Sequence, residues 1–247
     1  MGLHLDVEGV AICGDDDWIE EAIADNSLVA CTNGSYIREL YPDLCSAAFI
    51  LECSKGRGRL VGSFPEKTMT ANAYRGELLG LLAIHLLLLS VNKVSPELKG
   101  SVHIYSDCMG ALDRVEHLPP YRIPSKCRHS DILKTIMVNC SDLSFKRFFS
   151  RVQAHLDDSK AFHELKRPAQ LNCGCDAKAK MVLRNLESDS LPTQKPFPLE
   201  PLCIFVGKEK MTSDTGPQIR YWVQRQLAQA FFSSQNILYP DEFDEVA

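Results

Sequence analysis

The sequence has little of the residues and patterns that mark several large classes of protein. Its 14 glycines and 13 prolines among 247 residues are too few for a collagen-like or low-complexity chain. Its hydrophobic content of 45% excludes a wholly disordered chain. It shows no internal repeat, and it has neither a tryptophan-rich stretch nor a cluster of basic residues that would make an obvious binding surface. An ordinary globular protein is the remaining expectation.

No apolar run in the sequence is long enough to span a membrane. The longest run, residues 78–89, is interrupted by Gly80 and His85, whereas a transmembrane helix needs about 20 residues. The acidic N-terminus also lacks the basic and apolar stretches of a secretory signal. We therefore expect an intracellular protein of the cytoplasm or nucleus that is not secreted and has no membrane partner.

The ten cysteines have two possible explanations besides chance. A disulfide framework is typical of small secreted proteins, which this chain does not resemble, so we expect reduced and mostly buried thiols. The other explanation is a zinc-binding module formed by His155, His163, Cys173 and Cys175. Their spacing differs from the Cys-x₂-Cys pairs of common zinc sites, which makes this alternative the weaker one.

Charge is distributed unevenly along the chain. Residues 1–26 contain eight acidic residues and no Lys or Arg, and residues 27–190 contain 22 basic and 17 acidic residues. The mildly basic middle is compatible with a polyanionic ligand. The acidic segment is expected to be a solvated arm, or alternatively an arm that folds over the basic middle and competes with its ligand.

Apolar patterning predicts a mixed α/β domain. We expect strands over residues 27–32, 45–53, 60–64, 102–106 and 145–154, and helices over 71–91, from Asp107 onward, over 129–140 and over 171–186. The first three strands are close enough in sequence to form an antiparallel meander, and helices separate the later strands. The expected architecture is therefore one mixed sheet flanked by helices.

Composition divides the chain into three parts. An acidic N-terminal arm over residues 1–26 precedes the folded domain over 27–190, and residues 191–247 form a short C-terminal extension. The extension begins with a proline-rich linker over 192–201 and is expected to contain one amphipathic helix near 217–232.

One amide and three carboxylates fall where such a fold would bring them together. Asn33 ends the first strand and Asp107 ends the strand 102–106. Glu77 lies in the first long helix and Asp176 in the last one. Strand ends and facing helix turns form the usual site of an α/β sheet. Carboxylates gathered there repel one another unless a cation neutralises them, and Mg²⁺ prefers such oxygen ligands.

Each of these residues alone has a simpler possible role. Asp107 could cap the helix that follows it, and Asp176 could pair with Lys180 one helical turn later. Glu77 could be a surface charge on its helix. The order of the residues and their flanking sequences give the set its weight.

The flanking sequences resemble the motifs of ribonuclease H domains over residues 27–188. The matching segments are Asn33-Gly34-Ser35 for Asp-Gly-Ser, Ala73 to Glu77 for Ala-x-x-x-Glu, Tyr105 to Ala111 for a strand that ends in Ser-Asp, His155 for the mobile-loop histidine, and Asn172 to Asp176 for Asn-x-x-x-Asp. A single motif of this kind is common, whereas the full set in this order is a strong signal. Residues 75–83 and 196–201 are similar to ribonuclease H domains from reverse transcriptases of eukaryotic non-LTR retrotransposons.

The resemblance implies a mixed five-stranded sheet flanked by helices and a metal-dependent endonuclease that cuts the RNA strand of RNA–DNA hybrids. It implies a two-ion Mg²⁺ site, in which Mn²⁺ can substitute, held by Glu77, Asp107, Asp176 and the residue at position 33. It also implies that Glu77 faces the RNA 2′-hydroxyls and that His155 assists product release or proton movement. Because no polymerase motifs accompany the set, the chain resembles a detached, domesticated or relic copy of an element.

Asn33 departs from the family pattern, which has an aspartate at this position. An amide has the shape of a carboxylate but no charge, and its carbonyl oxygen is a weaker ligand. We therefore expect weakened metal binding and an activity reduced by orders of magnitude. Three possibilities stay open: an impaired endonuclease, an inactive protein that still binds hybrids, and a retroelement remnant that only folds.

Contacts with nucleic acid are expected from two motif residues and from basic residues of the middle segment. These are Ser35, Asn172, Arg57, Arg59, Lys146, Arg147 and Arg151. Lys and Arg neutralise phosphates and release counterions. Alternatively, Lys146 and Arg151 face solvent on a half-exposed strand. The sequence indicates no particular protein partner.

Overall fold

The computed structural model describes residues 11–15, 17–117, 123–124, 127–140, 143–154, 156–186, 194–213 and 215–234. Its main feature is a six-stranded sheet with the strand order β1-β4-β3-β2-β5-β6. The strands are β1 (Ala11–Gly14), β2 (Leu28–Ser35), β3 (Leu44–Cys53), β4 (Gly58–Lys67), β5 (Ser101–Ser106) and β6 (Lys146–Arg151). β2, β3 and β4 form an antiparallel meander, whereas β5 and β6 run parallel to β2.

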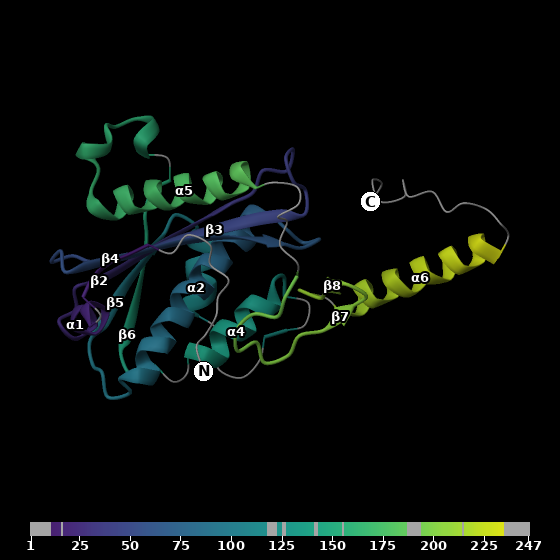
Figure 1. Cartoon of the computed structure of the whole chain (residues 1–247), viewed down its shortest axis with the longest axis horizontal. Helices are drawn as coiled ribbons and strands as arrows, with labels where there is room; N and C mark the ends of the chain where they lie inside the picture. The colour runs from purple at the N-terminus through teal and green to yellow at the C-terminus, as the bar shows by residue number, and fades with distance from the viewer. Residues whose placement is uncertain are drawn as a thin grey trace.

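Helices cover both faces of this sheet (Figure 1). The helices of the described residues are α1 (Trp18–Ala24), α2 (Ala73–Val94), α3 (Met109–Glu116), α4 (Ser130–Cys140), α5 (Arg167–Asn185) and α6 (Thr215–Ser234), with short 3₁₀ turns η1 (Leu156–Asp158) and η2 (Phe162–Glu164). α2 and α4 lie on one face of the sheet, and α5 lies on the other. This arrangement confirms the mixed sheet flanked by helices that the sequence predicts.

Helix α2 is the centre of the larger core. Its leucine-rich faces are buried between the sheet and α4, and a Cβ on Gly80 would lie only 1.7 Å from the hydroxyl oxygen of Thr32. Glycine at this point therefore lets the helix lie directly on β2. By length and composition this helix could cross a membrane, but 72% of its most apolar window is buried inside the protein. It is a core helix.

The acidic N-terminal segment is part of the domain from residue 11 onward, so the expectations of a solvated arm and of a five-stranded sheet are wrong here. β1 pairs antiparallel with β4 and adds the sixth strand. Trp18 is 3% exposed and packs on Gly58, where a Cβ would lie 2.4 Å from the indole ring. The apolar side of α1 is thus buried, while Asp25 at its end pairs with Lys55 at 2.8 Å.

Most other expected elements are confirmed with shifted ends. β2 continues through Asn33 to Ser35 because its pairing with β3 continues as far as Ser46, whereas the sequence predicted a turn there. β6 ends at Arg151 rather than near residue 154. Residues 1–10 of the arm, residues 187–193 before and within the linker, and the acidic end from residue 235 lie outside the described part of the chain.

The ten cysteines are all free thiols, as expected. Four of them are buried, namely Cys31, Cys45, Cys53 and Cys175. The expectation that most would be buried is wrong, because the other six lie on the edge strand β1, in connecting segments, at helix ends or on half-covered helix faces.

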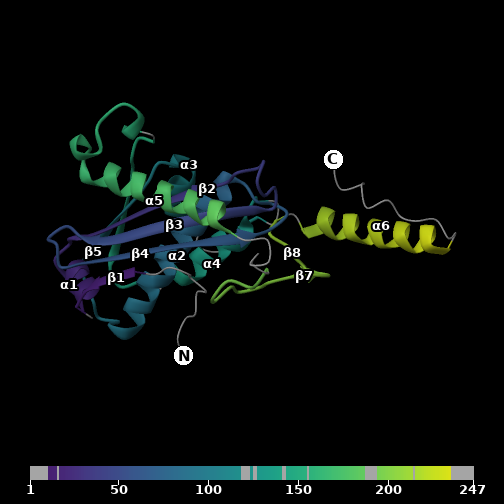
Figure 2. The ribbon, with the colours of Figure 1, turned by 45° about the horizontal axis from the view of Figure 1, so that its top comes forward.

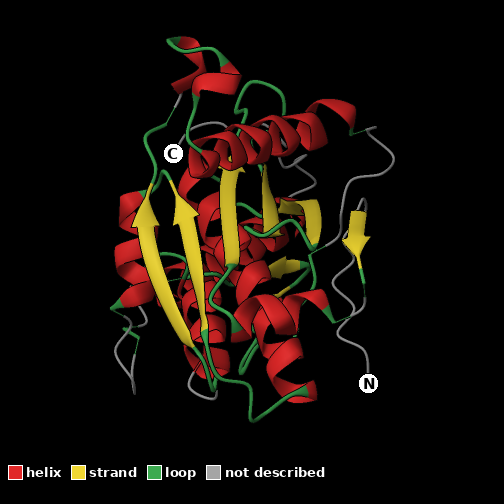
Figure 3. Cartoon of the chain, turned by 90° about the vertical axis from the view of Figure 1, so that its left-hand side faces the viewer, coloured by secondary structure: helices red, strands yellow, loops and turns green. Residues whose placement is uncertain are grey.

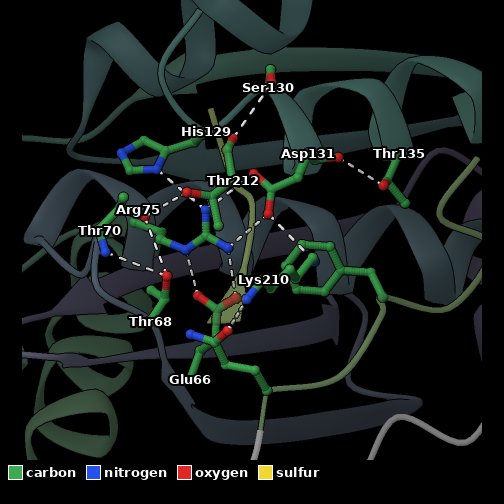
Figure 4. Close-up of polar contacts among 12 residues, drawn as sticks. Glu66, Thr68, Thr70, Arg75, His129, Ser130, Asp131, Thr135, Lys210 and Thr212 are labelled. Carbon is green, nitrogen blue, oxygen red and sulfur yellow. Dashed lines mark hydrogen bonds and ion pairs between the residues drawn. The ribbon is translucent and has the colours of Figure 1, made fainter. Parts of the chain in front are cut away.

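The first half of the C-terminal extension is anchored to the domain through a buried charge cluster (Figure 4). Arg75 of α2 is 0% exposed and donates to both carboxylate oxygens of Glu66 and of Asp131. Lys210 of the extension lies 2.9 Å from Glu200 and 3.4 Å from Asp131. Buried charges are stable only when paired in this way, so the extension supplies a counter-ion that the domain itself needs.

The second half of the extension is the predicted helix, α6. It follows the short hairpin of β7 (Phe205–Val206) and β8 (Glu209–Lys210), and it extends away from the domain in both views (Figures 1 and 2). Its apolar side chains at positions 219, 223, 227 and 231 are exposed.

Candidate active site

Two adjacent parallel strands bring Asn33 and Asp107 together. β2 and β5 are neighbours in the sheet, and both run toward the same edge. The Asn33 side chain is 5% exposed, and its Nδ2 donates to Oδ2 of Asp107 at 3.1 Å. The sequence therefore predicted correctly that these two positions meet.

Glu77 reaches the same site from the first turns of α2. Asn72 caps this helix by accepting a hydrogen bond from the backbone N–H of Arg75. Gly34 and Gly76 then allow the helix to touch β2, because a Cβ on Gly34 would lie 2.3 Å from the backbone nitrogen of Glu77. The N–H of Gly34 donates to Oε1 of Glu77 at 2.9 Å, which fixes the carboxylate beside the strand.

The second oxygen of the Glu77 carboxylate is held by a residue that the motif analysis did not assign. Ser106 donates from Oγ to Oε2 at 3.2 Å, and it also accepts from the backbone N–H of Cys108. Its place directly before Asp107, at the end of a buried strand, was the signal that could have identified it. Both oxygens of Glu77 are therefore oriented by neighbouring residues.

The environment of Glu77 favours its neutral form when no cation is present. Burial, with the nearby carboxylates of Asp107 and Asp176 as smaller causes, raises its pKa to about 8 against the lowering effect of the Gly34 and Ser106 donors. The site is therefore electronegative, and a cation would restore the charged carboxylate.

Helix α5 adds Asn172 and Asp176. Asn172 donates from Nδ2 to Oδ2 of Asp107 at 3.1 Å, and its Oδ1 accepts from Asn33 at 3.4 Å. Asp176 pairs with Lys180 at 2.6 Å, which is the simple i,i+4 role that the sequence also allowed. Asn172 was expected to contact nucleic acid, whereas in the structure it closes an amide network around Asp107.

The carboxylate oxygens of the site are ligands that suit a hard divalent cation, but in this structure they lie too far apart to bind one ion together. Within the described residues, the only three His, Cys, Asp or Glu ligand atoms within 4.8 Å of one another belong to the exposed Asp113, Glu116 and His117. The carboxylates of Glu77, Asp107 and Asp176 are more widely spaced. The carboxylate oxygens fit Mg²⁺, while the Asn33 nitrogen facing Asp107 does not.

Two basic residues proposed as nucleic-acid contacts lie at the wrong end of the sheet. Arg57 belongs to the β3–β4 hairpin, which lies beside the start of β2, about 16 Å from Asn33 along the strand. It pairs with Asp25 at 2.7 Å, and Arg59 lies 3.8 Å from Glu52. Arg57 and Arg59 therefore do not lie beside the carboxylates, and their contact with nucleic acid stays a prediction.

The other proposed contacts lie along β2 and β6. Arg151 is exposed and stands in register with Ser106, next to Asp107, whereas Lys146 is exposed at the far end of the same strand. Ser35 is buried at the end of β2. Arg147 points to the face of the sheet that α2 covers, and it donates to Nε2 of His85 at 2.9 Å.

Two further expectations concern histidines and zinc. His155 lies outside the described residues, so its expected role stays a prediction. Of the alternative zinc ligands, Cys175 is buried and donates its thiol to the carbonyl of Cys31 at 3.4 Å, and no group with His163 and Cys173 forms in the described part of the chain.

No protein-family model matches the sequence, and no curated protein sequence matches it. Among solved structures, the chain is similar to the N-terminal RNase H domain of Rv2228c from Mycobacterium tuberculosis, with a TM-score of 0.42, 10% identity and coverage of 64% of this chain and 93% of that one.

Two further structures are of the same kind. One is LC11-RNase H1 in complex with an RNA/DNA hybrid, with a TM-score of 0.43, 9% identity and coverage of 64% and 96%. The other is the protease-reverse transcriptase of prototype foamy virus, with a TM-score of 0.46, 15% identity and coverage of 65% of this chain and 21% of that one. At such identities the similarity concerns the fold.

Proposed function

We propose that this chain is a ribonuclease H-type nucleic-acid-binding domain, by descent a metal-dependent endonuclease of RNA–DNA hybrids whose cleavage activity is impaired. The observation that carries the proposal is one site built from four separate elements. These elements contribute Asn33, Glu77, Asp107, Asn172 and Asp176. Glu77, Asp107 and Asp176 occupy the positions of three of the family's four carboxylates, in the family's order.

A divalent cation is the cofactor that such a site would use. Glu77, Asp107 and Asp176 would hold Mg²⁺, or Mn²⁺ in its place, with the carbonyl oxygen of Asn33 as a weaker ligand. When bound, two such ions activate a water and stabilise the leaving oxygen of a phosphodiester.

The chain's own residues orient the carboxylates. Gly34 and Ser106 each hold one oxygen of Glu77, and Asn172 holds Oδ2 of Asp107. Preoriented oxygen ligands lower the cost of assembling the site when the substrate arrives. This part of the machinery is intact.

Asn33 is the part that impairs the site. Its amide nitrogen donates to Asp107, so the carbonyl oxygen faces Asp107 only after the amide turns and this hydrogen bond breaks. The site also carries one negative charge fewer than a site with aspartate at this position. Both effects weaken cation binding and reduce transition-state stabilisation.

The proposed ligand is the RNA–DNA hybrid, in keeping with the motif set. Arg151 is the basic residue placed beside the carboxylates, because it stands in register with Ser106. The similarity of residues 75–83 and 196–201 to retrotransposon domains supports an origin from a retroelement. An intracellular location fits such an origin.

A second candidate is an inactive protein that still binds hybrids. The specific observation in its favour is the closed network among Asn33, Asp107 and Asn172, in which Oδ2 of Asp107 accepts two amide donors without any cation. A remnant that only folds would share this network but would not discriminate among nucleic acids.

Hybrid binding tests the proposal independently of cleavage. A fluorescent RNA–DNA hybrid and a DNA duplex of equal sequence are titrated in Ca²⁺, at several salt concentrations and with Arg151→Ala and Lys208→Ala as matched variants. We expect tighter binding to the hybrid, a steep salt dependence, and weakening by Arg151→Ala alone. Absence of binding, or equal binding to both duplexes, contradicts a ribonuclease H-type function.

A further inference from the structure

One face of the sheet is left open over β5 and β6. Helix α5 packs mainly on β2 and β3, and it reaches β5 only at its edge. In Figure 3 the two left-most strands, β6 and β5, run side by side with no helix drawn in front of them. Within the described residues, no helix covers the α5-side face of these two strands.

Aromatic rings occupy this open face. His103 of β5 and Phe148 of β6 are register partners, and their rings stack at 5.0 Å with an interplanar angle of 29°. Phe148 is 45% exposed, and Tyr105 is half-buried on the same face. An exposed aromatic pair on a flat sheet is typical of a surface that stacks on another ring.

The charge of the two strands is of one sign. β6 contains Lys146, Arg147 and Arg151, and neither β5 nor β6 contains an acidic residue, although the whole chain has a net charge of −5. Lys146 lies on the open face with Phe148, whereas Arg147 and Arg151 alternate to the other face. A ring pair with a cation beside it and no acidic residue on the two strands complements a polyanion that carries its own rings.

The open face continues directly into the candidate active site. Side chains alternate along a strand, so His103, Tyr105 and Asp107 point to the same side of β5. Tyr105 and Asp107 are two residues apart, which is about 7 Å along the strand. A ligand lying on the rings would therefore lead to the carboxylates.

We propose that the open β5–β6 face binds single-stranded nucleic acid, stacking an unpaired base on the Phe148–His103 pair and placing a phosphate against Lys146. Bases inside a duplex are already stacked on both sides, so only an unpaired base can use these rings. The ligand is then a hybrid with a single-stranded extension beside the carboxylates. This inference rests on the proposed function in its choice of nucleic acid as ligand.

The test compares blunt hybrids with hybrids that carry single-stranded extensions of either polarity. Fluorescence anisotropy is measured for the native chain, Phe148→Ala, Phe148→Trp and the control Met181→Ala, which removes another exposed apolar side chain on α5. We expect an extension to increase affinity at least fivefold and Phe148→Ala to abolish that gain, with Phe148→Trp and Met181→Ala retaining it, since base–aromatic stacking is worth roughly this much or more. Affinity for the blunt hybrid should not change in Phe148→Ala.

The results that contradict this inference differ from those that contradict the proposed function. If blunt hybrids bind but extensions add nothing, the inference is wrong and the proposed function stands. If Phe148→Ala weakens blunt and extended hybrids equally, or changes the oligomeric state of the protein without nucleic acid, the face has another occupant and the inference is wrong. If no nucleic acid binds at all, both are overturned.

Discussion

The side-chain nitrogen of Asn33 donates a hydrogen bond to Oδ2 of Asp107 across 3.1 Å. Asn172 donates to the same oxygen at 3.1 Å. The carboxylate is thus stabilised by two neutral donors where a cation would otherwise be required. This relationship explains how the site can stay folded without metal, and it predicts what a change at position 33 does.

Restoring the carboxylate should make stability dependent on divalent cations. In Asn33→Asp, a donor next to Asp107 becomes a second negative charge, which costs about 1–3 kcal/mol in metal-free buffer. Thermal unfolding with chelator and with millimolar Mg²⁺ measures this, with NaCl of equal ionic strength as control. We expect a lowered Tm that Mg²⁺ recovers in the variant and a small response in the native chain. Equal responses of the two proteins would contradict the role of the amide.

The contact between Gly34 and α2 should tolerate no side chain. In Gly34→Ala the new Cβ would overlap the backbone of Glu77 and Gly76, so α2 must shift. Overpacking of this kind costs about 1–3 kcal/mol, which urea unfolding would show. Gly216→Ala is the control because its Cβ would meet nothing within 4 Å. Similar stability of the two variants would show that the close approach is not required.

Lys210 should be required for the stability of the whole domain. Lys210→Ala removes the cation beside Glu200 and leaves Asp131 with Arg75 alone. Breaking a buried ion pair commonly costs about 3–5 kcal/mol. Lys208→Ala changes an exposed lysine of the same segment and should have little effect. Chemical unfolding that shows no difference between the variants would mean that the extension does not stabilise the domain.

His85 should make the protein less stable as the pH falls below neutrality. It is fully buried, accepts from Arg147 at Nε2 and donates from Nδ1 to the carbonyl of Leu81, so it is held neutral. Burial, with the Arg147 charge as a smaller cause, lowers its pKa to about 3, whereas in the unfolded chain it protonates near its ordinary value.

The direction of this pH dependence follows from the number of protons that the folded and unfolded states bind. Between these two pKa values the unfolded state binds a proton that the folded state does not, so this contribution to stability is present near pH 7 and is lost as the pH falls toward 3. From pH 7 to pH 5 the loss is about 2 kcal/mol. Urea unfolding of the native chain and of His85→Gln at both pH values isolates the contribution of His85 to this loss of stability. A native and a variant protein with the same pH dependence would refute the assignment.

The sequence allowed much of the fold and site to be predicted for a definite reason. Glu77, Asp107 and Asp176 each stand at a fixed offset within a strand end or a helix that has a clear apolar pattern. The ends of those elements meet at one edge of the sheet once their order is known. Apolar periodicity placed the strands and helices, and the order of these residues with their flanking motifs singled out the positions.

Long-range pairing of charges could not be predicted in the same way. The ion pair between Arg57 and Asp25 could not be predicted, because the two residues meet only where the acidic segment packs beside the β3–β4 hairpin. Lys210 and Asp131 are far apart in sequence and meet only because the extension crosses α4. The four residues of β1 are too few for a strand pattern, so the sixth strand was missed.

The most direct test of the account is cleavage of a fluorescent RNA–DNA hybrid in Mg²⁺ and in Mn²⁺ by the native chain, Asn33→Asp and the double variant Asn33→Asp with Glu77→Gln. The account predicts little or no cutting by the native chain, a gain of orders of magnitude in Asn33→Asp, and loss of that gain in the double variant. Cutting by the native chain at the rate of Asn33→Asp would contradict the impairment by Asn33. Absence of cutting by Asn33→Asp in both metals would contradict the assignment of the site.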